Sequence, residues 1–397
     1  MTGNIWKAMT FWIVAIALVL TNSMVRAERN FDGDDRQFIQ KFYSSGTFDI
    51  EQFSSLFLSK ISPERLEQVS KNLQKVAGKF ESVSGADGKY VMLTDTHRMR
   101  VNLTRAADGK IAGLRFLQPE RRSPNLDEIK TEVAAFPGTT SLYIEKDGEV
   151  LIDHKANENL AVGSTFKIGI MKALEEAIDD GSLSWERVVR LKAKHKSLPS
   201  GKLQNMPVGS PFTLHTLAAL MMSESDNTAT DMLLDVVGWE PVAKILGLDV
   251  VLTTREFFAL KANPLEAEVW RNSKSGNRLE QKIRLSRYPL PAAPAVMRSY
   301  EMAIGWALST RKLCEIMMTL ERSSLLALNA GLASKEDWAY VAYKGGNDIG
   351  AYNYTTRVEW RGKKGCVSLT WNGDADTDIS KLVQLYREAL SGLKNSP

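Results

Sequence analysis

Strand-forming segments stand at both ends of the region 138–397, and a long helical region separates them. The first group is a hairpin over Thr140–Asp153, which alternates apolar and polar residues around the turn pair Asp147-Gly148. The helical region includes Phe166–Asp179 and Leu214–Ser223, where apolar residues recur at helical spacing. The later segments are three strands and a final helix, Val341–Lys344, Asn353–Trp360, Cys366–Trp371 and about Ile379–Leu390. The pattern predicts an α+β fold whose antiparallel sheet closes late, from distant parts of the chain.

A smaller domain is predicted over residues 28–120. Ser62-Pro63-Glu64 supplies an N-cap, a proline at the first helical position and an acid, so it begins a helix that runs to about Ala77. After Gly78, short alternating segments separated by Asp-Gly turns are typical of an antiparallel meander. This block holds no convincing catalytic set, so we interpret it as an accessory domain. Residues 121–137, which contain a short helical pattern, are interpreted as the linker to the domain 138–397.

Residues 1–27 have the pattern of a signal peptide. Lys7 precedes a 12-residue apolar run, Met9–Leu20, which is too short to span a bilayer, and small residues stand before the expected cut at Ala27. We therefore expect a bacterial protein that is periplasmic or secreted, without stable membrane insertion after cleavage; an uncleaved anchor is the alternative. In an oxidising compartment Cys314 and Cys366 are able to pair, but the sequence does not show that they meet.

The composition excludes several classes of function. The formal net charge is +4, from 51 Lys+Arg against 47 Asp+Glu, and so mild a balance argues against nucleic acid as a main partner. The two cysteines and four histidines are far apart and lack metal-ligand spacing. We therefore expect no metal and no cofactor, and chemistry that does not depend on histidine.

A serine and a lysine stand three residues apart where the helical region begins, in Ser164-Thr165-Phe166-Lys167. At a helix N-terminus Ser164 lies beside unpaired backbone N–H groups, and Lys167 shares its helix face. A partly desolvated lysine loses its proton near neutral pH and can act as the base that a serine nucleophile needs. Taken alone, this spacing occurs by chance in most proteins and indicates no more than an ordinary capped helix.

Two further polar motifs lie at the ends of predicted elements. Ser225-Asp226-Asn227 follows a helix and offers a hydroxyl to relay a proton, an amide to bind a carbonyl, and a carboxylate of the kind that holds a turn. Lys344-Gly345-Gly346 ends a strand, where the glycines allow close approach and the lysine adds positive charge. Together the three motifs indicate a site far more strongly than any one of them.

The motifs and their surroundings resemble the class A serine β-lactamases and the penicillin-recognising serine hydrolases, whose signature set is Ser-x-x-Lys, Ser-Asp-Asn and Lys-Thr-Gly. The similarity includes the hairpin Ser141–His154, Ser200–Gln204 and Ser225–Asp231, and it covers roughly residues 138–395. The two-domain layout also resembles the β-lactamase-like proteins of clavulanic-acid gene clusters. The resemblance implies a β-lactamase/transpeptidase-like domain, an antiparallel sheet with helices, after a small cystatin-like or steroid-isomerase-like α+β domain.

The resemblance assigns catalytic roles to three residues. By it, Ser164 is the nucleophile, and Lys167 accepts its proton directly or through water. Ser225 then passes a proton to the leaving nitrogen of the substrate.

It also assigns four residues to substrate binding. Asn227 contacts the substrate side chain, Lys344 supports the substrate carboxylate, and Gly346 lets the substrate backbone approach. The oxyanion hole consists of the backbone N–H groups of Ser164 and Asn347.

Two features depart from that family. Gly345 stands where the family has Thr or Ser, so the hydroxyl that would hold a carboxylate is missing. We find no Glu-x-x-Leu-Asn motif, whose glutamate activates the deacylating water in class A enzymes. Glu256 is the nearest candidate for that base, followed by Glu266 and Glu268. The range 271–298 has seven basic residues and one acid, which indicates either a solvated excursion or a basic lid over an anionic substrate.

Three functions are consistent with this site. The first is an exported active-site-serine hydrolase of the β-lactamase type, which opens β-lactam amides through an acyl-enzyme on Ser164 and confers antibiotic resistance. The second is an esterase or D-amino-acid peptidase that uses the same residues. The third is a penicillin-binding protein that deacylates slowly and is not a catalyst. All three act on a small β-lactam or on an acyl or peptide substrate.

Overall fold

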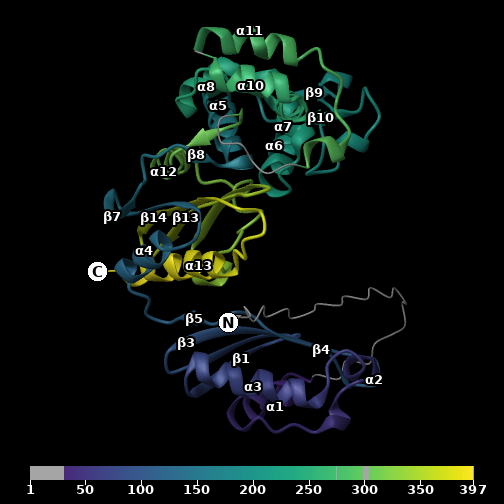
Figure 1. The fold of residues 1–397 in the computed structure, drawn as a ribbon, viewed down its shortest axis with the longest axis vertical. Coiled ribbons are helices and arrows are strands. Elements are labelled where there is room, and N and C mark those ends of the chain that lie inside the picture. The colour runs from purple at the N-terminus through teal and green to yellow at the C-terminus, as the bar shows by residue number, and fades with distance from the viewer. Residues whose placement is uncertain (1–30, 274, 298–303, 397) are drawn as a thin grey trace, which may run out of the picture. The chain divides into compact units, whose positions relative to one another are not determined.

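The computed structural model describes residues 31–273, 275–297 and 304–396, so the predicted signal peptide, 1–27, lies outside the described residues. The chain divides into two compact units, with the boundary between Ser123 and Pro124. Each unit has its own antiparallel sheet with helices packed on it (Figure 1). Within the described ranges, no helix is long and apolar enough to cross a membrane.

The first unit is an antiparallel meander covered by helices, as the sequence predicts for its strands. The sheet order follows the chain, β1-β2-β3-β4, with β5 paired to β3. Ser62 caps the third helix by accepting the N–H of Arg65, and phenylalanines such as Phe42 and Phe116 stack in the core. The elements are α1 (Asp32–Ser45), η1 (Ile50–Gln52), α2 (Ser55–Leu58), α3 (Pro63–Ala77), β1 (Phe80–Ala86), β2 (Lys89–Thr94), β3 (His97–Arg105), β4 (Ile111–Phe116) and β5 (Glu120–Arg121).

The sheet of the second unit joins strands from both ends of the region 138–397, which confirms the sequence prediction. Its order is β12-β13-β14-β6-β7 with every neighbour antiparallel, so the last strands of the chain reach the first hairpin through β14 and β6. Along β6, Leu142 and Ile144 enter one core and Tyr143 enters the other. The strands are β6 (Thr139–Lys146), β7 (Glu149–His154), β12 (Tyr340–Asp348), β13 (Ala351–Trp360) and β14 (Lys363–Asn372).

Two helices from opposite ends of the second unit, α4 (Leu126–Ala134) and α13 (Ser380–Asn395), cover one face of this sheet (Figure 1). Ile129 and Val133, one turn apart on α4, are buried in the same core as Leu385 of α13. The prediction that residues 121–137 form a linker is therefore wrong from Leu126 onward, because this apolar stripe packs α4 into the second unit.

The other face of the sheet packs against the helical region. Its central helix is α5 (Lys167–Asp179), in which Ile168, Met171 and Leu174 are completely buried, and α12 (Thr310–Thr319) lies against β13 and β14. The helices expected over 166–179 and 214–223 are confirmed. The remaining elements are β8 (Leu160–Ala161), η2 (Gly163–Phe166), β9 (Val188–Arg190), η3 (Ala193–His195), η4 (Leu203–Asn205), β10 (Pro211–Thr213), α6 (Leu214–Ser223), α7 (Asn227–Val237), α8 (Trp239–Leu246), α9 (Thr254–Ala262), α10 (Pro264–Asn272), α11 (Ser275–Leu285), η5 (Ala293–Val296), β11 (Ala307–Leu308) and η7 (Lys335–Asp337).

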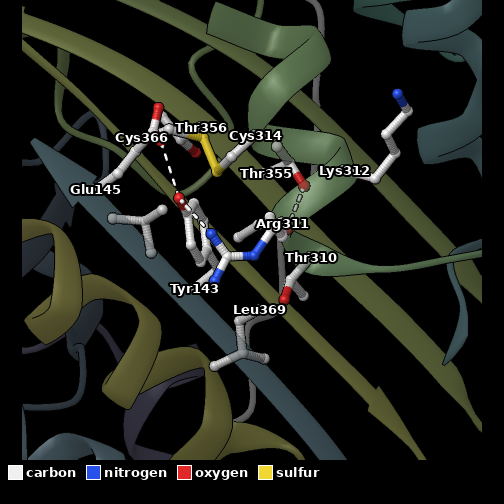
Figure 2. Close-up of a disulfide and its surroundings, with 12 residues drawn as sticks. Tyr143, Glu145, Thr310, Arg311, Lys312, Cys314, Thr355, Thr356, Cys366 and Leu369 are labelled. Carbon is white, nitrogen blue, oxygen red and sulfur yellow. Dashed lines mark hydrogen bonds between the residues drawn. A yellow bond between two sulfur atoms is a disulfide. The ribbon is translucent and has the colours of Figure 1, made fainter. Parts of the chain in front are cut away.

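A disulfide between Cys314 of α12 and Cys366 of β14 joins the helical region to the sheet (Figure 2). Both cysteines are completely buried, and their Cα atoms lie 5.8 Å apart. Beside them the Arg311 guanidinium lies over the Tyr143 ring, 4.7 Å from its centroid, and donates to the Tyr143 hydroxyl. The pairing that the sequence left open is therefore present in the structure.

Candidate active site

Ser164 lies in the 3₁₀ turn η2, which leads directly into α5. The turn is fixed from behind, because the N–H of Val162 donates to the carbonyl of Trp306 at 3.2 Å. The sequence places Ser164 at a helix N-terminus, and the structure places it one 3₁₀ turn before the first α-helical residue, Lys167. The Lys167 side chain is therefore on the first turn of α5, close behind the serine in the chain.

Strand β12 passes so close to Ser164 that only glycine fits at Gly346. A Cβ atom there would lie 2.0 Å from the carbonyl oxygen of Val162 and 2.6 Å from the backbone nitrogen of Ser164. Gly163, at a φ of 49°, makes the reciprocal approach, since its Cβ would lie 2.9 Å from the nitrogen of Asn347. The two glycines therefore bring the backbones of Ser164 and Asn347 together, as an oxyanion hole requires.

Lys167 is completely buried, and its side chain binds the motif Ser225-Asp226-Asn227 rather than Ser164. Its Nζ donates to the carbonyl of Ser225 at 2.6 Å, to the Oδ1 of Asn227 at 2.7 Å and to the Oγ of Ser225 at 3.1 Å. Among the described residues it makes no hydrogen bond to the Ser164 hydroxyl. Burial, with the nearby charge of Lys344, holds the pKa of Lys167 well below its usual range. The neutral amine that a base requires is thus favoured here.

Ser225 lies between the two buried lysines. Its Oγ accepts a hydrogen bond from Lys167 and another, at 3.0 Å, from the Nζ of Lys344. With both lone-pair positions used, its own proton is free to be donated to a third group. Ser225 has a φ of 57°, an uncommon value for a residue other than glycine, and such strain is typical of functional sites.

Lys344 of β12 is also buried, with 3% of its surface exposed. Besides Ser225, it donates to the carbonyl of Gly345 at 2.6 Å. Burial lowers the pKa of Lys344 to about 7. Two buried ammonium groups that share one hydroxyl repel each other, so the site favours the loss of one proton near neutral pH.

Asp226 holds the loop that carries Ser225, as the sequence analysis expects of this residue. One carboxylate oxygen caps α7 through the N–H of Ala229 at 2.8 Å. The other accepts the N–H groups of Lys202 at 2.6 Å and Leu203 at 3.0 Å. Asp226 thereby fixes two segments that border the site and has no oxygen left for chemistry.

Asn227 is brought to the site but its amide is engaged within the protein. Its Oδ1 accepts from Lys167, and its Nδ2 donates to the carbonyl of Leu198 at 3.0 Å. The residue still lines the cleft next to Ser164. In this arrangement the first task of Asn227 is to orient Lys167, and a substrate contact would use the second amide hydrogen.

The missing hydroxyl at Gly345 has a structural explanation in Tyr343, two residues earlier on the same face of β12. A Cβ atom on Gly345 would lie 2.0 Å from the Tyr343 hydroxyl oxygen, so the tyrosine occupies the space of a side chain at 345. Gly331, at a φ of 58°, makes room on another side, because its Cβ would lie 2.5 Å from the Tyr343 ring. Threonine at position 345 is therefore incompatible with Tyr343 as placed.

The hypothesis that Glu256 activates the deacylating water is wrong. Its carboxylate accepts the N–H of Thr253 at 2.8 Å, in a capping box that begins α9, and forms a buried ion pair with Lys282. Glu256 is 5% exposed and is not among the residues that line the cleft. The spacing Thr253-x-x-Glu256 is itself the sequence signal of a capping box, and it could have excluded this residue.

The two other glutamates and the basic segment also have structural roles. Glu266 accepts from Gln281 and Tyr288 and pairs with Arg284 at 3.5 Å, and Glu268 is exposed on α10. Arg278 lies over the ring of Trp270. The charges of Arg278, Lys282 and Arg284 are thus bound within the protein, which argues against a basic lid.

A cleft of about 310 Å³ opens beside Ser164. Ser164, Asn227 and Asn347 line it, together with residues that the sequence analysis did not identify: Pro199, Ser200, Thr254, Phe257, Phe258, Trp306, Asp348, Ile349 and Tyr352. Most of these come from elements that the chain brings together over long distances, so no local pattern marks them. Across the described ranges, no group of three or more His, Cys, Asp or Glu side chains is placed to hold a metal ion.

Asp231 is a further buried carboxylate near the site, and the sequence analysis assigned no role to it. It is buried on α7, and its oxygens accept the N–H groups of Thr254 at 2.7 Å and Arg255 at 3.0 Å. Burial raises the pKa of Asp231 to about 7. Asp231 thereby anchors the beginning of α9, the helix that forms one wall of the cleft.

Residues 126–255 match the model of a family described as the beta-lactamase enzyme family. Three solved structures are similar over about two thirds of the chain. PBP-A is 18% identical over 69% of this chain and 97% of its own, with a TM-score of 0.47. A β-lactamase from Sphaerobacter thermophilus DSM 20745 is 22% identical over 68% and 98%, with a TM-score of 0.45. An ancestral class A β-lactamase is 16% identical over 69% and 98%, with a TM-score of 0.48. No curated protein matches the chain.

Proposed function

We infer that this chain, whose residues 126–255 match the model of the beta-lactamase enzyme family, is a serine hydrolase that opens β-lactam amides through an acyl-enzyme on Ser164. One observation carries the proposal: Lys167 and Lys344 both donate to the Ser225 hydroxyl in a buried cluster behind the cleft that Ser164 lines. This arrangement supplies a base, a proton relay and a positive charge without histidine or metal ligands.

Acylation begins when neutral Lys167 takes the Ser164 proton, directly or through a water. The Ser164 oxygen attacks the β-lactam carbonyl, and the N–H groups of Ser164 and Asn347 stabilise the oxyanion, each by about 3–4 kcal/mol. As the C–N bond breaks, the nitrogen takes the Ser225 proton, and the proton held by Lys167 restores the Ser225 hydroxyl. The low pKa of Lys167 supports the first step, and the Lys167–Ser225 hydrogen bond supports the last.

Deacylation is proposed to be slow. Among the described residues, Asp348 is the only carboxylate that lines the cleft, and both its oxygens accept from the Nζ of Lys261 at 2.6 Å. Asp231 and Asp226 are buried and hold backbone N–H groups. Since a water needs a positioned base to attack the ester quickly, the acyl-enzyme should persist. This favours slow hydrolysis through a long-lived acyl-enzyme over fast β-lactamase turnover.

Export to the periplasm or the exterior is part of the proposal. It is supported by the signal-peptide pattern of residues 1–27 and by the buried pair Cys314–Cys366, because disulfides form and persist mainly in oxidising compartments.

The second candidate is an esterase or a peptidase for D-amino-acid peptides. It is favoured by one observation, the replacement of a side chain at Gly345 by the Tyr343 ring, which alters the place where a β-lactam carboxylate would bind. The same acyl-enzyme on Ser164 would serve both reactions.

Intact-mass spectrometry after mixing with benzylpenicillin tests the proposal. We expect a one-to-one adduct that persists for many minutes, and no adduct on Ser164→Ala. An adduct that disappears rapidly would identify a fast β-lactamase and contradict slow deacylation. No adduct, combined with hydrolysis of a nitrophenyl ester that depends on Ser164, would favour the second candidate.

A further inference from the structure

We propose that the cleft beside Ser164 selects substrates whose acyl side chain is uncharged and aromatic. This inference rests on the proposed function, because it concerns the group that Ser164 would carry as an acyl-enzyme. It adds a substrate class to the reaction and is argued from the walls of the cleft.

One wall of the cleft consists of Trp306, Phe257 and Phe258, and the buried ring of Phe166, which does not line the cleft, stacks on Trp306. Trp306 lies parallel to Phe166, with ring centroids 3.8 Å apart and an interplanar angle of 2°, and Phe257 packs against Trp306 at 4.8 Å. Phe166 is completely buried, and Phe257 and Trp306 are each 5% exposed, so packing fixes their positions before any substrate binds. Phe258, half-buried beside Phe257, extends the wall. A rigid aromatic wall binds an aromatic ring without a further cost of ordering.

The rest of the lining mixes apolar residues with uncharged polar side chains and one paired carboxylate. Ile349 and Tyr352 come from the turn after β12 and from β13, and Pro199 comes from the loop that Asp226 fixes. The volume of about 310 Å³ is at the low end of the range for small-molecule pockets, roughly 300–1,000 Å³. The cleft therefore suits one ring better than a long or branched substituent.

No free charge faces the cleft from the residues that line it. Lys261 of α9 neutralises Asp348, and the pair is nearly buried, with 4% and 19% of the side chains exposed. The polar side chains of Thr254 and Asn227 already bind Ser197 and Lys167. A charged substituent would lose its water without gaining an oppositely charged partner among the lining residues, and this desolvation opposes its binding.

The experiment compares three penicillins that differ only in the acyl side chain: benzyl, α-carboxybenzyl and methyl. The second-order rate constant for acylation of the full-length protein is measured by intact mass. We expect the benzyl compound to acylate the protein about tenfold faster than each of the other two compounds. A single apolar group bound in a pocket changes such a rate constant by at least about tenfold. Equal rates for the three compounds would overturn the inference.

Two substitutions of Phe258 test whether the aromatic wall causes this preference for the benzyl compound. Phe258→Ala should lower the ratio of benzyl to methyl rates about fivefold, whereas Phe258→Leu should keep most of it. The control is Leu265→Ala, since Leu265 is 75% exposed on α10 and is not among the cleft residues. A Phe258→Ala protein that loses rate equally with both compounds would overturn the role of the wall.

A second set of acyl compounds, two nitrophenyl esters, separates this inference from the proposed function. If no penicillin acylates the wild type, the proposed function fails, and nitrophenyl phenylacetate is then compared with nitrophenyl acetate for a Ser164-dependent reaction. A Ser164-dependent preference for the phenylacetyl ester would support the aromatic cleft by itself. Equal rates with the two esters, or no reaction with either ester, would overturn the inference of an aromatic cleft in addition to the proposed function.

Discussion

Lys344 donates to the Ser225 hydroxyl at 3.0 Å across 119 residues of sequence, and thereby joins strand β12 to the loop before α7. Lys167 reaches the same oxygen at 3.1 Å from the first turn of α5. Ser225 is therefore the point where three separate elements of the site meet, and its removal should affect the protonation of both lysines.

Ser225→Ala should slow acylation by benzylpenicillin by a factor of about 10²–10⁴, the usual contribution of a positioned proton-transfer group. The fold should survive, because the variant removes one half-buried oxygen. The measurement is the rate of adduct formation by mass spectrometry, with circular dichroism as the check on folding. A folded variant within about threefold of the wild type would show that protons reach the leaving nitrogen by another route.

Acylation by carboxylate-bearing penicillins should weaken as the pH rises above about 7. Lys344, whose pKa burial lowers to about 7, is charged below that pH and attracts the carboxylate, and it becomes neutral above it. A nitrophenyl ester without a carboxylate should show no such fall in rate above pH 7. Lys344→Arg, which keeps its charge, should abolish the fall for penicillins. If the acylation rate falls equally above pH 7 for both substrates, the fall belongs to the titration of a group other than Lys344.

Glu256→Gln should destabilise the protein and leave the adduct lifetime unchanged. The variant loses the ion pair with Lys282 and weakens the capping box at Thr253, at a cost of about 1–3 kcal/mol. Urea unfolding measures the first effect and mass spectrometry the second, with the exposed Glu268→Gln as the control. A longer-lived adduct would restore Glu256 as the deacylating base.

Gly346→Ala should abolish acylation, because its Cβ would lie 2.0 Å from the carbonyl oxygen of Val162 and must push β12 away from Ser164. The expected loss of stability is about 1–3 kcal/mol. Gly33→Ala serves as the control, since a Cβ there meets nothing within 4 Å. Labelling of a folded Gly346→Ala protein at the wild-type rate would show that the close approach is dispensable.

Removal of the disulfide in Cys314→Ser/Cys366→Ser should lower the free energy of unfolding by about 2–4 kcal/mol. Acylation should continue in the folded fraction, because neither cysteine lies among the residues that line the cleft. Thermal unfolding with and without a reductant measures the effect. A wild type that is as stable reduced as oxidised would contradict it.

The sequence predicts the parts of this fold that depend on short-range patterns. The hairpin around Asp147-Gly148, the cap at Ser62 and the helix after Ser164 follow from neighbouring residues, and the structure confirms them. The closing of the sheet from both ends also follows, since isolated strands need partners. The sequence analysis does not separate the helix over 126–134 from the linker, because the packing of this helix against α13 is a long-range contact.

The site is predicted less completely, for the same reason. Ser164 and Lys167 are three residues apart in the chain, so their common place near the site has a local signal. Trp306 and Tyr352 reach the cleft from distant segments and carry no such signal. Gly345 looks like a lost hydroxyl in the sequence, and only the packing of Tyr343 shows what fills its place.

The sheet order has a consequence for synthesis of the protein. A chain that stops before Tyr340 contains Ser164, Lys167 and Ser225 but neither Lys344 nor the Asn347 amide. Incomplete chains therefore carry an inert serine. Reactivity toward acylating compounds should appear only when the ribosome has released nearly the whole chain, so that covalent capture of an antibiotic reports on a finished molecule.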